Sequence, residues 1–140
     1  MDDGNCFACG ADNPIGMHLK FERTGEGSVR SRVELGSQFQ GWQGIAHGGI
    51  AMALLDEAMA HAAAAAGHRG VTASMQLRFR RPVPLGHAVL VEGRVNWIRR
   101  NVLGLSARVS DPADGSLLLE AEGSFVSKGP INALRDRRNS

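Results

Sequence analysis

The sequence is short of several residue types, and each shortage excludes a class of protein. It has no tyrosine and only 5% aromatic residues, so it offers few rings for stacking nucleic-acid bases. Its formal net charge of +2 is too small to indicate nucleic-acid binding by itself. With only two cysteines it is not a small scaffold held together by disulfides. Its 43% hydrophobic and 21% charged residues match the globular average, which excludes a disordered chain.

Targeting and membrane signals are also missing. No stretch of about 18 or more apolar residues is free of charge, so no transmembrane helix is expected. The first residues, MDDGNC, carry acids in place of a basic region followed by an apolar core, so no signal peptide is expected. We therefore expect a cytoplasmic protein that associates with neither a membrane nor nucleic acid.

The two cysteines, Cys6 and Cys9, form one C-x-x-C pattern near the N-terminus. A zinc site of four ligands needs a second pair at finger or ribbon spacing, and none follows, although His18 could supply a third ligand. A redox motif would follow a strand and begin a helix, whereas FACGADNPIG is rich in turn residues. The simplest interpretation is two reduced thiols beside a turn, and we expect no metal and no cofactor.

The chain length of 140 residues fits one domain, which we place at 1–130, and the basic tail 131–140 has no periodicity and is expected to be disordered. One helix of about 18 residues is predicted between Gly49 and Gly67, where IAMALLDEAMAHAAAAA is dense in helix formers. Alternating or β-rich patterns predict strands at 17–23, 28–35, 71–81, 87–98, 102–110 and 117–127. This order indicates an α+β fold in which a helix lies on an antiparallel sheet.

The predicted helix has no polar stripe, because Ile50, Met52, Leu54, Leu55, Met59 and the alanines cover all its sides. It is therefore expected to be buried all round. A single sheet covers only one side of a helix, so we expect a second copy of the chain to cover the other.

Two adjacent carboxylates, Asp56 and Glu57, lie within this apolar helix. Glu57 has His61 four residues on as a partner, whereas Asp56 has no cation at helical spacing. A carboxylate in such surroundings either has a raised pKa or is satisfied by groups from elsewhere in the fold, and both active sites and structural networks contain such acids.

The helix is preceded by His47, Gly48 and Gly49, with no Ser, Thr, Asp or Asn at the cap position. The N–H groups of the first turn are therefore expected to be free to polarise an oxygen, unless water occupies them. Asp56 lies seven residues beyond Gly49, about 10 Å along the axis, so one helix cannot bring the base and the donors together. Two antiparallel helices related by a two-fold axis could do so.

The stretch FQGWQGIAHGGIAMALLDEAM resembles the signature of the hotdog-fold acyl-coenzyme A thioesterases, the phenylacetate-pathway and 4-hydroxybenzoyl-CoA thioesterase-like superfamily. CFACGADNPIGMHLKFE and VTASMQLRFRRPVPLG resemble two further segments of that family, so the resemblance covers about residues 5–127. It implies a curved antiparallel sheet wrapped around one central helix. It also implies a homodimer or a dimer of dimers, which would be a homotetramer, with active sites at the subunit interface.

The resemblance also implies roles for individual residues. The catalytic carboxylate falls on Asp56, as general base or nucleophile, and the oxyanion donor on the backbone N–H of Gly48 or Gly49. Thr72 would orient the attacking group, and His47 would orient the loop. Some relatives have an Asn at the position of Gly41, and Gln43 is a candidate substitute for it.

The leaving group implied is coenzyme A, and arginine suits its phosphates. Between residues 78 and 108 lie seven arginines and only one acid, Glu92, and we expect Arg80 and Arg81 to bind the phosphates. The alternative for any one of these arginines is a solvated sheet face. Two other functions remain open, a hydratase or dehydratase on the same fold and an acyl-CoA-binding module without catalysis.

Overall fold

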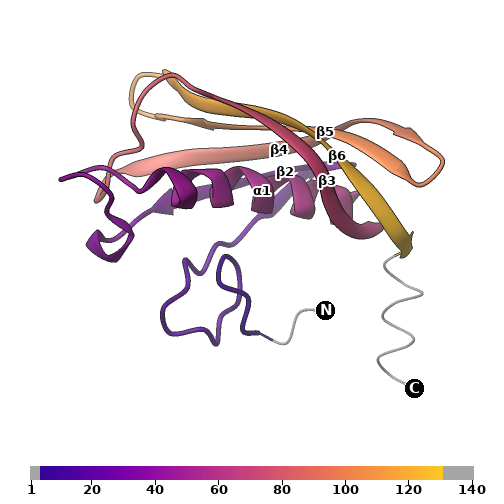
Figure 1. The fold of residues 1–140 in the computed structure, drawn as a ribbon, viewed down its shortest axis with the longest axis horizontal. Helices are drawn as coiled ribbons and strands as arrows, with labels where there is room; N and C mark the ends of the chain where they lie inside the picture. Colours follow the sequence, from indigo (N-terminus) through magenta and orange to yellow (C-terminus); the bar gives the residue numbers. More distant parts are fainter. Residues whose placement is uncertain (1–3, 131–140) are drawn as a thin grey trace.

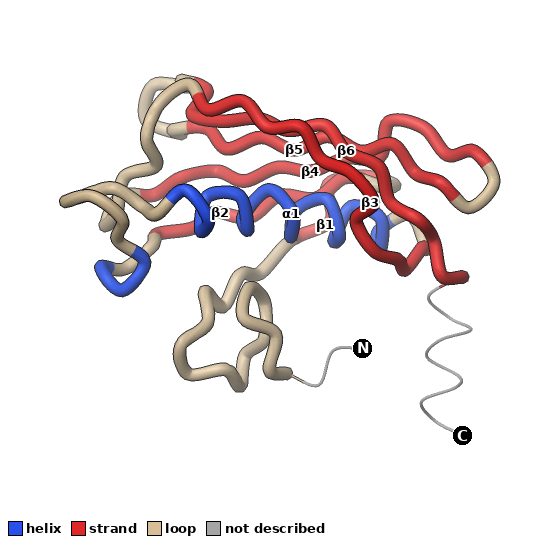
Figure 2. The backbone as a smooth tube through the Cα atoms, viewed as in Figure 1, coloured by secondary structure: helices blue, strands red, loops and turns tan. Residues whose placement is uncertain are grey.

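The computed structural model describes residues 4–130 as one long helix packed on one face of a six-stranded antiparallel sheet (Figures 1 and 2). The predicted α+β class is therefore confirmed. The tail 131–140, which was expected to be disordered, lies outside the described residues. In chain order the elements are β1 (Glu22–Gly25), β2 (Ser28–Glu34), the short 3-10 helix η1 (Ser37–Phe39), α1 (Gly48–Ala65), β3 (His68–Phe79), β4 (Ala88–Arg99), β5 (Val102–Ser110) and β6 (Leu117–Pro130).

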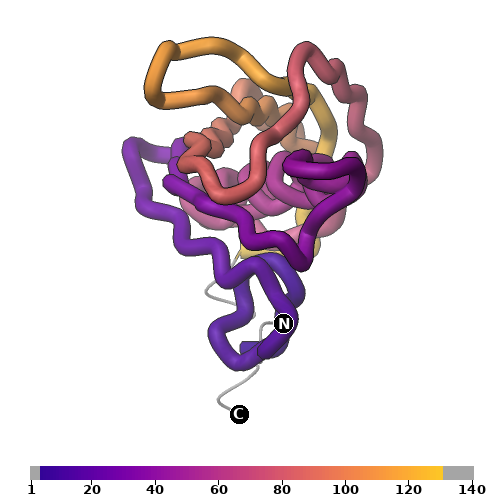
Figure 3. Tube along the Cα trace, turned by 90° about the vertical axis from the view of Figure 1, so that its left-hand side faces the viewer, coloured from indigo at the N-terminus to yellow at the C-terminus, as the bar shows by residue number. Residues whose placement is uncertain are grey.

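The strands lie in the order β1-β2-β4-β5-β6-β3, and each pairs antiparallel with its neighbours. The chain leaves β2, forms α1 across the sheet face, and returns as β3 at the far edge. Seen end on in Figure 3, the strands curve around α1. This crossover places β3 beside the helix and at the opposite edge of the sheet from β1.

The helix is held to the sheet by one continuous apolar face and by one very close backbone approach. A Cβ atom on Gly93 of β4 would lie 2.4 Å from the carbonyl oxygen of Ala58, so only glycine permits this contact. Part of the remaining surface of the helix is not covered within one chain, and Met52 is 40% exposed there. The residues of the buried face are Ala51, Leu54, Leu55, Ala58, Met59, Ala62 and Ala63.

The first predicted strand is mostly wrong. Of residues 17–23 only the last two belong to β1. Met17 and Leu19 instead donate backbone hydrogen bonds to Phe7 and Ala8, at 2.7 and 2.8 Å. His18 between them has a positive φ of 53°, which breaks an extended strand. The alternating pattern thus reflects pairing with the N-terminal segment rather than with the sheet.

The other predicted strands agree with β2 to β6 apart from shifts of up to three residues at their ends. The helix begins at Gly48, within the predicted glycine pair, because His47 caps it. No helix within residues 4–130 is long and apolar enough to cross a membrane.

Candidate active site

The side chain of His47 caps the start of α1, although histidine is not among the residues preferred at this position. The Nδ1 atom of His47 accepts a hydrogen bond from the backbone N–H of Gly49 at 2.9 Å. The carbonyl oxygen of His47 accepts from Ile50 and Ala51 at 2.9 and 3.0 Å. The expectation that all first-turn donors are free is therefore wrong for Gly49. Among residues 4–130, only the N–H of Gly48 in this turn has no acceptor.

Gly48 opens into a small cavity of about 340 Å³ at the end of the helix. Its lining includes His47, and Gln43 is not part of it. At Gly41, where some relatives have an asparagine, an added Cβ would lie 2.9 Å from the Cα of His47. The backbone of Gly41 therefore packs directly against His47, and there is no room here for the side chain of an asparagine. The lining residues are Gly41, Trp42, Ile45, Ala46, His47, Gly48 and Pro82.

The second half of the site joins α1 to β3. The Oγ1 atom of Thr72 donates a hydrogen bond of 2.7 Å to Oδ1 of Asp56. The register of β3 against β6 shifts between Thr72 and Ser74, an irregularity of the kind that re-aims side chains at functional positions. Asp56 is half-buried. The carboxylate that lacked a partner on its own helix thus finds one on the neighbouring strand.

Within one chain these two halves remain apart. Asp56 does not line the cavity at Gly48, and their separation of eight positions corresponds to about 12 Å along the helix axis. The N–H of Gly48 and the carboxylate of Asp56 are therefore separated within one chain, as the helix spacing predicted.

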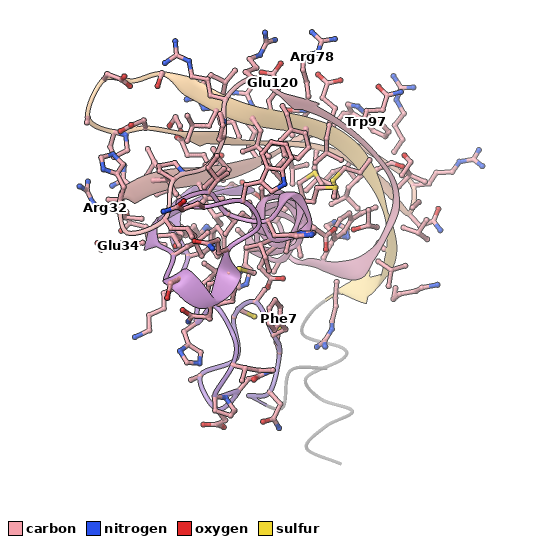
Figure 4. The ribbon with its side chains drawn as sticks, turned by 60° about the vertical axis from the view of Figure 1, so that its left-hand side comes forward. Phe7, Arg32, Glu34, Arg78, Trp97 and Glu120 are labelled. Carbon is pink, nitrogen blue, oxygen red and sulfur yellow. The ribbon has the colours of Figure 1, made fainter. Side chains whose placement is uncertain are left out.

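Two of the seven arginines between residues 78 and 108, Arg80 and Arg108, form ion pairs with carboxylates on neighbouring strands. On the face away from α1, one row alternates in charge through all six strands, and Figure 4 shows two of its members, Arg78 and Glu120. The Arg108 guanidinium lies 3.1 Å from Glu92, and that of Arg80 lies 3.0 Å from Glu120. In strand order the row is Glu22, Arg30, Glu92, Arg108, Glu120 and Arg78.

Arg80 and Arg81 follow β3 and precede Pro82, which lines the cavity. Arg81 lies near Asp114, whose pKa is lowered chiefly by hydrogen bonds from Ser116 and also by this arginine. The expected contact of Arg80 and Arg81 with phosphates stays a prediction. The acids near them come from elsewhere in the chain, Glu120 from β6 and Asp114 from the turn between β5 and β6.

A further cluster escaped the sequence analysis. The predicted pair of Glu57 and His61 is confirmed at 3.1 Å. The structure brings Cys6 and Cys9 to the same carboxylate, on the side of the helix that faces the N-terminal segment. Burial raises the pKa of the Cys9 thiol, and the hydrogen bond to Glu57 raises it further. The i, i+4 spacing of Glu57 and His61 in an apolar helix indicated their pairing, but nothing in the sequence indicated that the cysteines lie beside Glu57.

Comparisons with known proteins agree with this architecture. The family model of the Thioesterase superfamily matches residues 43–117, which span the H-G-G motif, Asp56 and Thr72. The bovine (Bos taurus) acyl-coenzyme A thioesterase THEM4 is 26% identical over 131 residues, which cover 93% of this chain and 54% of that protein. The chain thus spans about half the length of this curated relative.

Solved structures share the fold. The crystal structure of a thioesterase superfamily protein aligns with a TM-score of 0.82 and 30% identity, covering 87% of this chain and 60% of the other. A hypothetical thioesterase protein from Streptococcus pneumoniae, solved with coenzyme A, aligns with a TM-score of 0.75 and 18% identity, covering 80% and 90%. Variants of that protein with one aspartate or one threonine replaced by alanine align with TM-scores of 0.74 and 0.73.

The predicted hotdog fold, one helix within a curved antiparallel sheet, is therefore confirmed. Since the family model covers more than half of the residues, the chain belongs to the Thioesterase superfamily.

Proposed function

We propose that the protein is an acyl-CoA thioesterase that hydrolyses its substrate to a free acid and coenzyme A. The observation that carries the proposal is the hydrogen bond between Asp56 and Thr72. Asp56 lies on the same helix as Gly48, whose N–H group has no acceptor among residues 4–130. A base held in one orientation and an unsatisfied donor are the two parts that thioester hydrolysis needs.

The relatives support the same substrate class. The bovine relative is named an acyl-coenzyme A thioesterase, and the pneumococcal protein was solved with coenzyme A. The aspartate and threonine replaced in the pneumococcal variants lie sixteen residues apart in that sequence. Asp56 and Thr72 are also sixteen residues apart, which supports assigning the reaction to them.

In the proposed reaction, the N–H of Gly48 donates to the thioester carbonyl oxygen and stabilises the negative charge that develops there. Asp56 either takes a proton from the attacking water or attacks the carbonyl carbon itself. The carbon–sulfur bond breaks and the thiolate of coenzyme A leaves, taking up the proton that comes from the water molecule. If Asp56 is the nucleophile, this water hydrolyses the acyl–Asp56 anhydride in a second step, which releases the free acid and restores the carboxylate. An oxyanion donor contributes about 10²–10³ in rate and a general base about 10²–10⁴, so no cofactor is needed. His47 holds the helix end through Gly49.

The proposal requires a homodimer, because one chain keeps Gly48 and Asp56 about 12 Å apart along α1. Two copies packed with antiparallel helices would place Asp56 opposite Gly48 of the partner subunit. The face of α1 that one chain leaves uncovered contains Asp56 and the exposed Met52. β3 adjoins this face as an edge strand of twelve residues, with Val71 56% exposed, and can pair with a second β3. A dimer of dimers would repeat this unit.

Coenzyme A would approach along the residues beside Pro82. Arg81 is the stronger candidate for a phosphate contact, because the guanidinium of Arg80 is already paired with Glu120. Asp114 also attracts Arg81, and a phosphate would compete for it. We keep the cytoplasm as the proposed location of the protein.

The test is thiol release from a panel of short, medium, long and aryl acyl-CoAs. Asp56→Asn is expected to retain dimerisation and substrate binding and to lose most hydrolysis, whereas the matched Glu26→Gln change in the exposed β1–β2 turn should retain both. Unchanged turnover in Asp56→Asn would refute the assignment. Acyl-CoA binding without hydrolysis by the wild type would favour the binding module, and hydration of a double bond would favour the hydratase.

A further inference from the structure

The N-terminal segment, residues 5–19, lies beneath α1 and outside the sheet (Figures 1 and 3). It contains no helix and no strand. Of its residues only Ala8 and Leu19 are apolar and fully buried in the core, and Cys6, Cys9 and Met17 pack against it partly buried. Phe7, seen in this segment in Figure 4, makes an edge contact with Phe39 at 6.2 Å between ring centres. A segment with so little buried apolar area gains much from a further attachment.

We propose that Cys6, Cys9 and Glu57 bind a zinc ion that fastens this segment to the helix. The two Sγ atoms and a carboxylate oxygen of Glu57 all lie within 4.8 Å of one another. Donors around a tetrahedral zinc ion lie about 2.0–2.3 Å from the metal and hence roughly 3.3–3.8 Å from each other. Contraction by about 1 Å brings the three donors to this geometry, and water completes the tetrahedron.

The cysteine turn is shaped to hold metal-bound sulfur. The backbone N–H of Cys9 points at Sγ of Cys6 at 3.5 Å, and such a donor stabilises a thiolate more than a thiol. The next residue, Gly10, donates its N–H to the Cys6 carbonyl oxygen at 2.9 Å. A Cβ atom at Gly10 would lie 2.4 Å from the backbone nitrogen of Cys6, so glycine is required for this turn.

The donor chemistry selects a borderline-soft cation. Thiolate ligands favour zinc over magnesium or calcium, and a carboxylate is a common additional zinc ligand. Cys6, Cys9 and Glu57 are all partly buried, and the Glu57 side chain is only 15% exposed. Binding releases one proton from each thiol, and the dication compensates two of the three negative charges that result.

His61 supports the proposed ligand set without joining it. Its Nε2 atom is hydrogen-bonded to Oε1 of Glu57 at 3.1 Å, and its ring stacks on Phe21 with centres 4.7 Å apart. Outer partners of this kind orient a ligating carboxylate, and their loss typically weakens metal affinity by about 10- to 100-fold. His61 is therefore a positioning residue for Glu57.

This site is separate from the proposed hydrolysis, although Glu57 follows Asp56 in the helix. The side chain of Glu57 faces the cysteines, whereas that of Asp56 faces Thr72. The metal would act structurally, by holding residues 5–19 against the turn of α1 that carries both acids.

The test measures metal directly and needs no enzyme assay. The full chain, with any affinity tag removed, is purified without chelator, loaded with zinc, desalted, and analysed by elemental mass spectrometry. About one zinc ion per chain is expected. In a parallel cobalt titration, the wild type should develop sulfur-to-cobalt charge-transfer absorption that saturates at one equivalent. Less than a tenth of an equivalent of zinc, or no charge-transfer band, would overturn the proposal even if every variant failed to fold.

Variants assign the ligands. Cys6→Ser, Cys9→Ser and Glu57→Gln should each lose the stoichiometric metal, and competition with a chelator should show His61→Gln to be about 10- to 100-fold weaker. His87→Gln, at an exposed histidine paired with Asp111, is the matched control and should bind like the wild type. Full zinc retention by either serine variant, or a Cys6–Cys9 disulfide in place of metal in the purified chain, would contradict the proposal.

Discussion

Replacing Gly48 by proline should remove one N–H group from the start of α1 and little else. Gly48 is the first residue of the helix, a position where proline is favoured because this N–H makes no bond within the helix. His47, which precedes it, has φ −56° and ψ 140°, and this ψ suits a residue before proline. An added Cβ at Gly48 meets no atom within 4 Å. The folded chain should therefore accept Gly48→Pro with unchanged or slightly increased stability.

The expected effect on catalysis is large. Removal of one oxyanion donor costs about 10²–10³ in kcat, or about 2.7–4 kcal/mol of transition-state stabilisation. Gly49 cannot replace the lost donor, because its N–H is bound to His47 at 2.9 Å. Gly48→Ala is the matched control, since it adds a Cβ atom and retains the N–H group.

The assay is steady-state thiol release from an acyl-CoA, with a protein blank for the two cysteines, together with a thermal melt of each variant. We expect kcat of Gly48→Pro to fall at least 100-fold while its Tm stays level, and Gly48→Ala to remain within a few-fold of the wild type. A proline variant that folds and retains a third or more of the wild-type kcat would refute the assignment of Gly48 as the donor.

Three further changes test other parts of the structure. Thr72→Val removes the hydrogen bond to Asp56 at nearly constant volume. A bond to a charged group is worth about 1.5–3 kcal/mol, so kcat should fall about 10- to 100-fold, Thr72→Ser should restore it, and an active valine variant would argue against this role. Arg81→Ala should raise KM for an acyl-CoA more than for the same acyl group on pantetheine, which lacks the nucleotide phosphates; equal changes would exclude a phosphate contact. Gly93→Ala should destabilise the fold by about 1–3 kcal/mol in denaturant titrations, because its Cβ would press on the Ala58 carbonyl, whereas Gly25→Ala in β1 should not, because its Cβ would lie in ordinary contact with Ser28 at 3.8 Å.

The local features of this protein were predictable from its sequence because they depend on neighbouring residues. The helix between the two glycine positions, the strands β2 to β6 and the pairing of Glu57 with His61 follow from periodicity and i, i+4 spacing. The position of Asp56 on an apolar helix, about 10 Å along the axis from the glycine pair, was likewise visible. The segment at residues 17–23 misled the prediction, since an alternating pattern does not specify which backbone it pairs with.

Tertiary structure decided the contacts between distant residues. The side chain of His47 accepts the N–H of Gly49 and leaves that of Gly48 without an acceptor among residues 4–130, and this depends on the His47 rotamer. The hydrogen-bond partner of Asp56, Thr72, comes from β3, sixteen residues along the chain. Arg80 and Arg108 looked unpaired in the sequence because their acids, Glu120 and Glu92, lie on other strands. Cys6 and Cys9 meet Glu57 only when the N-terminal segment folds beneath α1. The spacing of residues in the sequence determines which side chains share one face of a helix or strand. The packing of helices and strands determines which side chains from different elements come into contact, because those contacts depend on topology and register.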